Sequence, residues 1–275
     1  MNMNAENHQN GRAEKALKDI QKEDENQLVV SYLTLRKLIG WCGILLPPIL
    51  WLVWHENQCF HSFEGSISDY YYTPAGDIFV IILSALGLFL FTYNGYERLE
   101  KILLKTAAVC AVLVPLVPTN PKCEKNGAIC TDCLKAIHNP KDRGFLGNYI
   151  NDNWHLFFAL VFLFCLAVIS IKYFTKSLDP ILVKRNGKLT QKGKRNVIYK
   201  ACGWIIIGSL IILAILMGAE HINDNPVFPG VPVIFIFETV SVWAFGLSWL
   251  TKGETLFPDK PEEMQFENSN HHFQA

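Results

Sequence analysis

The sequence is poor in charged residues. Only 18% of the 275 residues are Asp, Glu, Lys or Arg, whereas an ordinary soluble domain carries about 25%. The 25 basic and 25 acidic residues cancel, so no net positive field would attract nucleic acid. The chain has no His-Glu-x-x-His or His-x-x-Glu-His metal motif and no visible internal repeat. Because 50% of the residues are hydrophobic, a disordered chain is excluded and a soluble globular enzyme is disfavoured.

Six long apolar stretches contain most of these hydrophobic residues. A helix needs about 20 apolar residues to cross a hydrocarbon core of about 30 Å, and inside lipid the backbone must satisfy its own polar groups. The sequence therefore predicts an all-α polytopic membrane helix bundle with six transmembrane helices. They run from Leu38 to Trp54, Asp77 to Tyr96, Ile102 to Pro118, Trp154 to Tyr173, Val197 to Gly218, and Val231 to Leu250.

The polar parts of the chain predict its domain organisation. Residues 1–33 are expected to form a disordered cytoplasmic tail, residues 34–253 the transmembrane domain, and residues 254–275 a second cytoplasmic tail. The outer loops are expected at 55–76, 119–153 and 219–230. The first span should act as a signal anchor because its apolar run begins only after 37 polar residues. Pro47 and Pro48 lie at its centre, where they leave backbone carbonyls that need other partners.

Lys and Arg predict the orientation. With six spans, 20 of the 25 basic residues lie on the side of the two termini and 5 lie on the other side. Basic residues favour the cytoplasmic side of a membrane. The sequence therefore predicts a multi-pass protein of the plasma (inner) membrane with both termini in the cytoplasm. Membrane lipids are its expected partners, and no nucleic acid is expected to bind.

Four of the eight cysteines fall in the predicted outer loops. An even number of cysteines on the oxidising side indicates structural disulfides, although the sequence does not choose among the three pairings. Two alternatives stay open: a zinc site with His138 as a further ligand, and a redox pair in the Cys-x-x-Cys motif. The four outer cysteines are Cys59, Cys123, Cys130 and Cys133.

Ionisable side chains at membrane depth are costly and therefore indicate function. Glu238 is the clearest, about 10 Å into the last span at 1.5 Å per residue, with Ser241 on the same face. Asp77 opens the second span, where it can also simply stabilise a helix N-terminus. His155 and His221 lie at the outer ends of two later spans. Each histidine can equally be a solvated or helix-capping residue.

The segment from Ser66 to Pro74, SISDYYYTP, is the most unusual of the chain. We expect it to lie along the outer interface as a short turn or re-entrant segment that leads into Asp77. Its three tyrosines can form an aromatic belt with a helix cap. Alternatively, the segment, with Asp69, forms a lid or wall of an outward-facing cavity.

Three stretches carry a resemblance. SISDYYYT (Ser66 to Thr73), RNVIYKACG (Arg195 to Gly203) and ETVSVWAFGLSWLTKG (Glu238 to Gly253) resemble an uncharacterised bacterial family of six-span integral membrane proteins. The order of Ser and Asp on an early span and His on later spans is loosely similar to the alkaline ceramidase and progestin/adiponectin receptor superfamily. That similarity implies a metal-dependent membrane hydrolase or a relative of one. The chain differs in having six predicted spans rather than seven, and Glu238 where that superfamily has His-x-x-x-His.

The leading interpretation is a protein that binds a lipid or small ligand in an outward-facing polar cavity, without turnover. It requires no cofactor or metal ion. The residues expected to line the cavity are Glu238, Asp77, Asp69, His155, His221 and Ser241.

Two alternatives from other classes remain. One is a proton-coupled transporter or channel in which Glu238 titrates, with Asp77 nearby. The other is a metal-dependent hydrolase, with Asp69 or Glu238 as the general base. Its metal ligands would be His155, His221 and either His61 or His138.

Overall fold

The computed structural model describes residues 30–55, 63–119, 153–176, 184–185, 188–223, 228 and 230–258. Within these ranges the chain is almost wholly helical, as predicted. A 3-10 turn, η1 (Ser68–Tyr72), precedes α2, and a π-helical turn, η2 (Ile169–Tyr173), ends α5. The two-residue strands β1 (Lys184–Arg185) and β2 (Lys188–Leu189) pair in an antiparallel ladder. The long helices are Val30–His55, α2 (Gly76–Thr92), α3 (Arg98–Leu116), α5 (Asn153–Val168), α6 (Gln191–Asn223) and α7 (Val233–Lys252).

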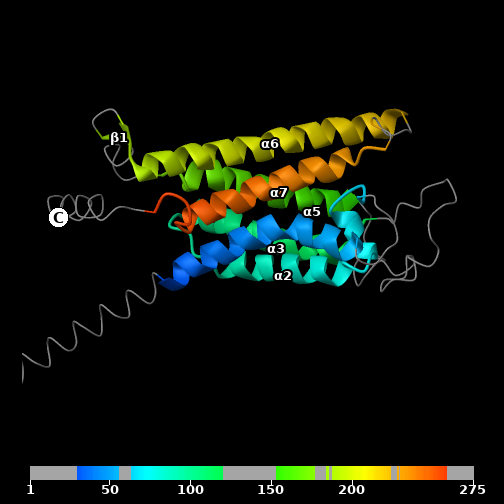
Figure 1. Cartoon of the computed structure of the whole chain (residues 1–275), viewed down its shortest axis with the longest axis horizontal. Helices are drawn as coiled ribbons and strands as arrows, with labels where there is room; N and C mark the ends of the chain where they lie inside the picture. Colours follow the sequence, from blue (N-terminus) through cyan, green and yellow to red (C-terminus); the bar gives the residue numbers. More distant parts are fainter. Residues whose placement is uncertain are drawn as a thin grey trace, which may run out of the picture.

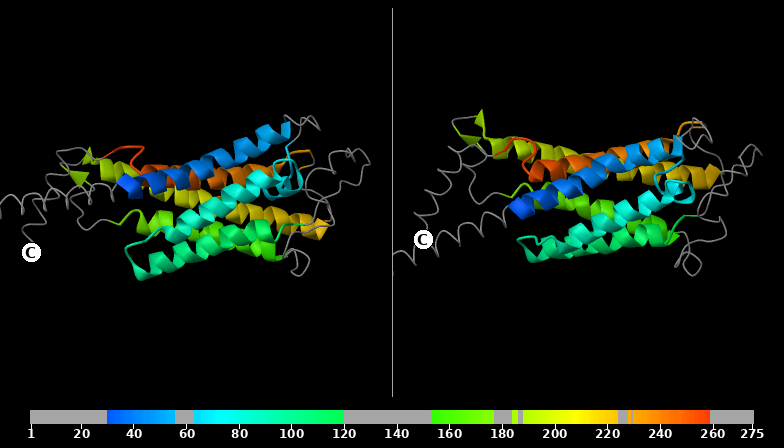
Figure 2. Two further views of the ribbon diagram at one scale, coloured as in Figure 1. Left: turned by 90° about the horizontal axis from the view of Figure 1, so that it is seen from below. Right: turned by 60° about the horizontal axis from the view of Figure 1, so that its bottom comes forward.

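The helices form one elongated bundle in which neighbours in sequence are neighbours in space. α2 packs on α3, α3 on α5, α5 on α6 and α6 on α7. The Val30–His55 helix lies between α7 and α2 (Figures 1 and 2). Val30 and the residues that follow α7 lie at the same end of the bundle (Figure 1). We call this the basic end, and we call the opposite end, which holds η1 and the start of α7, the tyrosine end.

Glycine allows the first and last long helices to touch. A Cβ atom added at Gly40 would lie 2.8 Å from the backbone nitrogen of Leu250, and one added at Gly246 would lie 2.7 Å from the carbonyl oxygen of Gly40. Small residues at such crossings let helix backbones approach closely in membranes. This contact brings Arg36 and Lys252 to the same end of the bundle.

The proline pair of the first helix leaves a backbone carbonyl that another part of the chain satisfies. Pro48 has no N–H to donate to the carbonyl of Ile44, four residues earlier. The indole Nε1–H of Trp243 on α7 donates to that carbonyl at 3.1 Å. The backbone group freed by proline is thus satisfied across the helix crossing, and the helix continues to His55.

Among the described helices, four are long and apolar enough to cross a membrane: Val30–His55, Asn153–Tyr173, Gln191–Glu220 and Val233–Lys252. Only 28% to 50% of the residues in their apolar windows are buried inside the protein. The remaining apolar surface faces outward, as expected for contact with lipid. α2 is apolar but shorter, and α3 carries Arg98, Glu100, Lys101 and Lys105 in its first turns. The predicted number of six spans is therefore not confirmed.

The predicted boundaries agree only in part with the structure. The first helix begins at Val30, so residues 30–33 belong to it rather than to the tail; Thr34 donates its hydroxyl to the Val30 carbonyl at 2.8 Å there. α6 runs to Asn223, five residues into the loop expected at 219–230. Much of the outer loops and most of both tails lie outside the described residues, and so do Cys59, Cys123, Cys130 and Cys133. The cysteines inside the described helices, Cys42, Cys110, Cys165 and Cys202, are free thiols.

Candidate functional site

At the tyrosine end, Glu238 binds the segment that leads into η1. Its carboxylate oxygens accept hydrogen bonds from the Ser66 hydroxyl at 3.0 and 3.2 Å and from the backbone N–H of Ile67 at 2.6 Å. One turn earlier on α7, the N–H of Phe235 donates to the carbonyl of Gly65 at 3.0 Å. The carboxylate therefore fastens this segment to α7.

His155, at the start of α5, binds the same segment from the other side. Its Nδ1 lies 2.8 Å from the carbonyl oxygen of Val117 and 3.1 Å from that of Val114, so Nδ1 must carry a proton. The Val114 carbonyl would bond to residue 118 in a continuous helix, but Pro118 has no N–H. Nε2 lies 2.8 Å from the hydroxyl oxygen of Ser68. The imidazole is 3% exposed and caps the end of α3, the helix-capping role considered for this residue from the sequence.

A third group of contacts joins η1 to the residues after α3. The Tyr72 hydroxyl donates to the carbonyl of Thr119, and Thr119 lies 3.5 Å from a carboxylate oxygen of Asp69. The side chains of Tyr70, Tyr71 and Tyr72 are all buried. The tyrosine segment therefore packs into the end of the bundle, and its hydroxyl groups do not form an open belt.

The structure brings three of the six predicted site residues to one segment: Glu238, His155 and Asp69. Asp77 is exposed at the start of α2. Ser241 is fully buried and donates to the Phe237 carbonyl of its own helix at 2.9 Å. His221 lies in the last turn of α6, and its side chain is outside the described part of the structure. Within the described parts of the chain, no group of three His, Cys, Asp or Glu side chains converges as metal ligands do. Whether the six residues bind a ligand stays a prediction.

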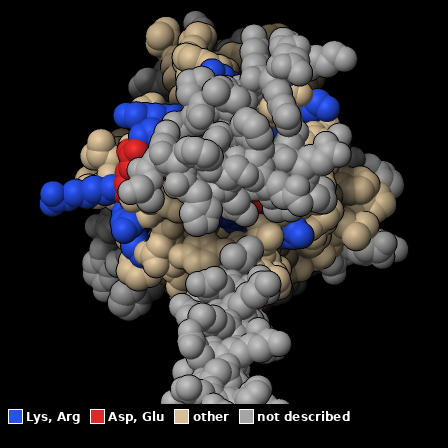
Figure 3. Space-filling model, turned by 90° about the vertical axis from the view of Figure 1, so that its left-hand side faces the viewer, with Lys and Arg blue, Asp and Glu red and all other residues tan. Residues whose placement is uncertain are grey.

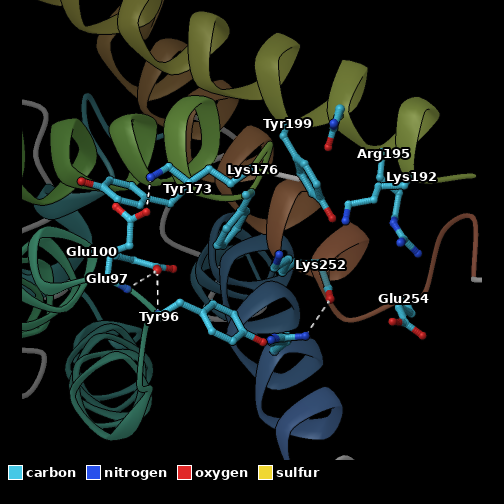
Figure 4. Close-up of a pocket in the computed structure, with 13 residues that line it drawn as sticks. Tyr96, Glu97, Glu100, Tyr173, Lys176, Lys192, Arg195, Tyr199, Lys252 and Glu254 are labelled. Carbon is cyan, nitrogen blue, oxygen red and sulfur yellow. Dashed lines mark hydrogen bonds and ion pairs between the residues drawn. The ribbon is translucent and has the colours of Figure 1, made fainter. Parts of the chain in front are cut away.

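The basic end holds a cavity of about 790 Å³ (Figure 4). Its walls come from the first helix, the α2–α3 connection, the π-turn and the ends of α6 and α7, which are distant in sequence. Lys and Arg side chains surround this end of the molecule (Figure 3). The charged lining is five cations, Arg36, Lys176, Lys192, Arg195 and Lys252, and three carboxylates, Glu97, Glu100 and Glu254. We call this cavity the basic pocket.

Two of the three carboxylates already have partners. Glu97 forms an ion pair with Lys176. Glu100 accepts the backbone N–H of Tyr96 at 2.8 Å and that of Glu97 at 3.4 Å, which closes a capping box at the start of α3. Glu97 therefore offsets the charge of Lys176, and the lining as a whole keeps more cations than carboxylates.

Lys252, the last residue of α7, packs its side chain against two aromatic rings of the pocket. Its ammonium lies 5.2 Å from the centre of the Phe174 ring and 6.0 Å from that of Tyr199, at cation–π distance. Among the described residues, no carboxylate lies within ion-pair distance of it. The ammonium therefore rests on aromatic faces and has donor capacity to spare.

Arg36 approaches the pocket from the first helix. Its Nε–H donates to the Tyr93 hydroxyl at 3.1 Å and its Nη1 to the Lys252 carbonyl at 3.4 Å. The Tyr93 hydroxyl thus orients the guanidinium without cancelling its charge.

The turn after α7 closes the pocket in a strained conformation. Glu254 and Phe257 have φ values of 58° and 53°, in the left-handed region that costs about 1–2 kcal/mol for residues other than glycine. This turn places Glu254 on the pocket wall and presents the Phe257 carbonyl to Arg195, which donates to it at 3.0 Å. Backbone strain of this kind is often found at functional sites.

Sequence reasoning missed this pocket because it counted Arg36, Arg195 and Lys252 only as orientation signals. The position of a Lys at the end of a helix does not reveal whether its side chain points to water, to lipid or to the bundle axis.

Comparisons of the chain with family models, with curated proteins and with solved structures find no match. The function must therefore be inferred from the geometry of this chain.

Proposed function

We propose that this chain is a multi-pass membrane protein that binds an anionic ligand in the basic pocket. The observation that carries the proposal is the ammonium of Lys252, which borders a cavity of about 790 Å³ without a carboxylate partner in the described structure. Volumes of about 300–1,000 Å³ are usual for small-molecule sites. Charge-assisted hydrogen bonds from Lys and Arg would hold the anion.

Orientation signals alone do not account for the pocket. Basic residues on the cytoplasmic side need only be present, and the positive-inside rule sets no direction for their side chains. Lys200 meets that requirement as an exposed residue on α6. The pocket residues instead converge from five separate parts of the chain (Figure 4). Their convergence favours recognition of a ligand, which would enter from the cytoplasm if the predicted orientation holds.

This proposal moves the binding site away from the outward-facing cavity expected from the sequence. Glu238 and His155 at the tyrosine end already have protein partners, and these partners join α7, α5 and the end of α3. Those contacts support a structural role for them.

Binding without transport is favoured by what lies between the two polar ends. Phe245 and Trp249, in the last two turns of α7, belong to the buried core at 1% and 0% exposure. The ring of Trp249 packs against those of Phe245, Tyr93 and Phe174. This aromatic layer supports a closed-ended pocket over a continuous polar path, so the transporter alternative receives less support.

The test is ligand-dependent stability of the purified protein. We would measure thermal unfolding in detergent with increasing inorganic phosphate and pyrophosphate at constant ionic strength, so that salt screening is the same in every sample. A ligand at 100 times its Kd stabilises a folded protein by about 2.7 kcal/mol. Lys252→Gln removes one charge-assisted hydrogen bond, worth about 1.5–3 kcal/mol. Affinity should therefore fall about 10- to 150-fold.

Lys200→Gln is the matched control, because it removes one Lys charge from an exposed position on α6. It should leave the affinity unchanged. The proposal fails if no anion stabilises the wild-type protein, or if Lys252→Gln and Lys200→Gln bind the anion equally well.

A further inference from the structure

We infer that the ligand of the basic pocket is a phosphate ester: a phosphate group with at least two negative charges, attached to a body that packs on aromatic rings. This inference rests on the proposed function and deepens it. Three properties of the pocket support it: its excess charge, its size and its aromatic lining.

The charge of the lining favours a multiply charged anion. Five cations and three carboxylates give a formal excess of two positive charges. Arg36 and Arg195 each use part of the guanidinium to bond a backbone carbonyl, of Lys252 and of Phe257, which fixes the position of the side chain. A planar guanidinium matches the oxygen geometry of phosphate, and Lys adds a point charge. A dianionic phosphate would balance the excess, whereas a single carboxylate would leave part of it unopposed.

The size of the pocket excludes an inorganic ion as a full occupant. A water molecule in the liquid takes up about 30 Å³, so a cavity of about 790 Å³ has room for a much larger molecule than a bare phosphate. The phosphate would fill the cationic part and leave the rest to the body of the ligand.

Aromatic side chains line the pocket, and the exposed ring of Tyr96 offers a surface for that body. Four rings line the pocket, those of Tyr96, Tyr173, Phe174 and Tyr199. The π-turn at the end of α5 contains Tyr173 and is followed by Phe174, and π-turns are frequently found at functional sites. Tyr96 is 83% exposed and belongs to the same lining (Figure 4). Apolar or planar groups stack favourably on such rings.

Two sources can supply this chemistry: a soluble organic phosphate such as a nucleotide, or the headgroup of an anionic phospholipid. Both present a phosphate ester and an adjoining apolar or planar part. The pocket lies at the end of the apolar helices, where lipid headgroups and cytoplasmic solutes would both reach it.

The experiment compares probes of one chemistry by native mass spectrometry and equilibrium binding. The soluble arm uses adenosine diphosphate, inorganic phosphate and acetate with detergent-solubilised protein. The lipid arm uses nanodiscs of phosphatidylcholine with and without phosphatidic acid. At least one ester should bind about tenfold or more tightly than inorganic phosphate, and acetate should bind most weakly. The arm that contains the tighter ester identifies the source.

Tyr96→Ala is the diagnostic variant, because an exposed ring can be removed with little effect on folding. It should lower the affinity for the ester severalfold and leave the affinity for inorganic phosphate unchanged, while Tyr96→Phe should keep wild-type affinity for both. If inorganic phosphate binds as tightly as both esters, or Tyr96→Ala weakens both equally, the inference is overturned and the proposed anion site stands. If no probe binds, both fail.

Discussion

Replacing Glu238 with Gln tests whether this carboxylate is structural. The carboxylate accepts hydrogen bonds from the Ser66 hydroxyl oxygen at 3.0 Å and from the Ile67 backbone nitrogen at 2.6 Å. A hydrogen bond to a charged group contributes about 1.5–3 kcal/mol in soluble proteins, and bonds between membrane helices average about 0.6 kcal/mol with a maximum near 1.7. Glutamine keeps one acceptor oxygen and loses the charge. The free energy of unfolding should therefore fall by about 1–3 kcal/mol.

A double-mutant cycle isolates the contact. Unfolding by SDS in mixed micelles would be measured for Glu238→Gln, Ser66→Ala and the double variant. Residues in direct contact couple by about 0.5–3 kcal/mol, whereas independent sites add within about 0.5 kcal/mol. Glu220→Gln serves as the control at the same end, because the described structure shows no hydrogen bond for the Glu220 side chain. Additive effects, or an equal loss in Glu220→Gln, would refute the structural role of Glu238.

Three further outcomes are expected. Gly40→Ala places a Cβ 2.8 Å from the Leu250 nitrogen and should lower stability by about 1–3 kcal/mol; Gly208→Ala, with nothing within 4 Å, should not lower it in the same unfolding assay. Thiol titration of denatured, unreduced protein should find four thiols, those of the free cysteines, whereas eight would exclude the predicted outer disulfides. Lys200→Cys in sealed vesicles should react only from the cytoplasmic side; labelling from outside would reverse the predicted orientation.

The helical fold class could be predicted because a long apolar segment inside lipid must satisfy its own backbone hydrogen bonds, and an α-helix does so. The extent of the spans could not be settled, because α3 combines an apolar second half with Arg98, Glu100, Lys101 and Lys105 at its start. The need for a partner at a proline-freed carbonyl was also predictable. That Trp243 is the partner depends on the crossing at Gly40 and Gly246, which only the three-dimensional structure reveals.

For the candidate site, too, some features could be predicted from the sequence and others depend on the three-dimensional structure. A sequence identifies Glu238 and His155 as costly groups near a membrane, yet it does not show which partners reduce that cost. His155 was associated with metal binding or capping, and the choice depends on the carbonyls of Val114 and Val117. The basic pocket was invisible because its walls come from helix ends up to 216 positions apart, as Arg36 and Lys252 are.

An experimental structure of the protein at saturating concentration of the tighter phosphate ester would test the central claim most directly. We predict density for the phosphate between Lys252, Arg36 and Arg195, with the body of the ligand against Tyr96 or Tyr199. Density at Glu238 and the tyrosine end, or an empty basic pocket at a ligand concentration that stabilises the protein, would contradict the account.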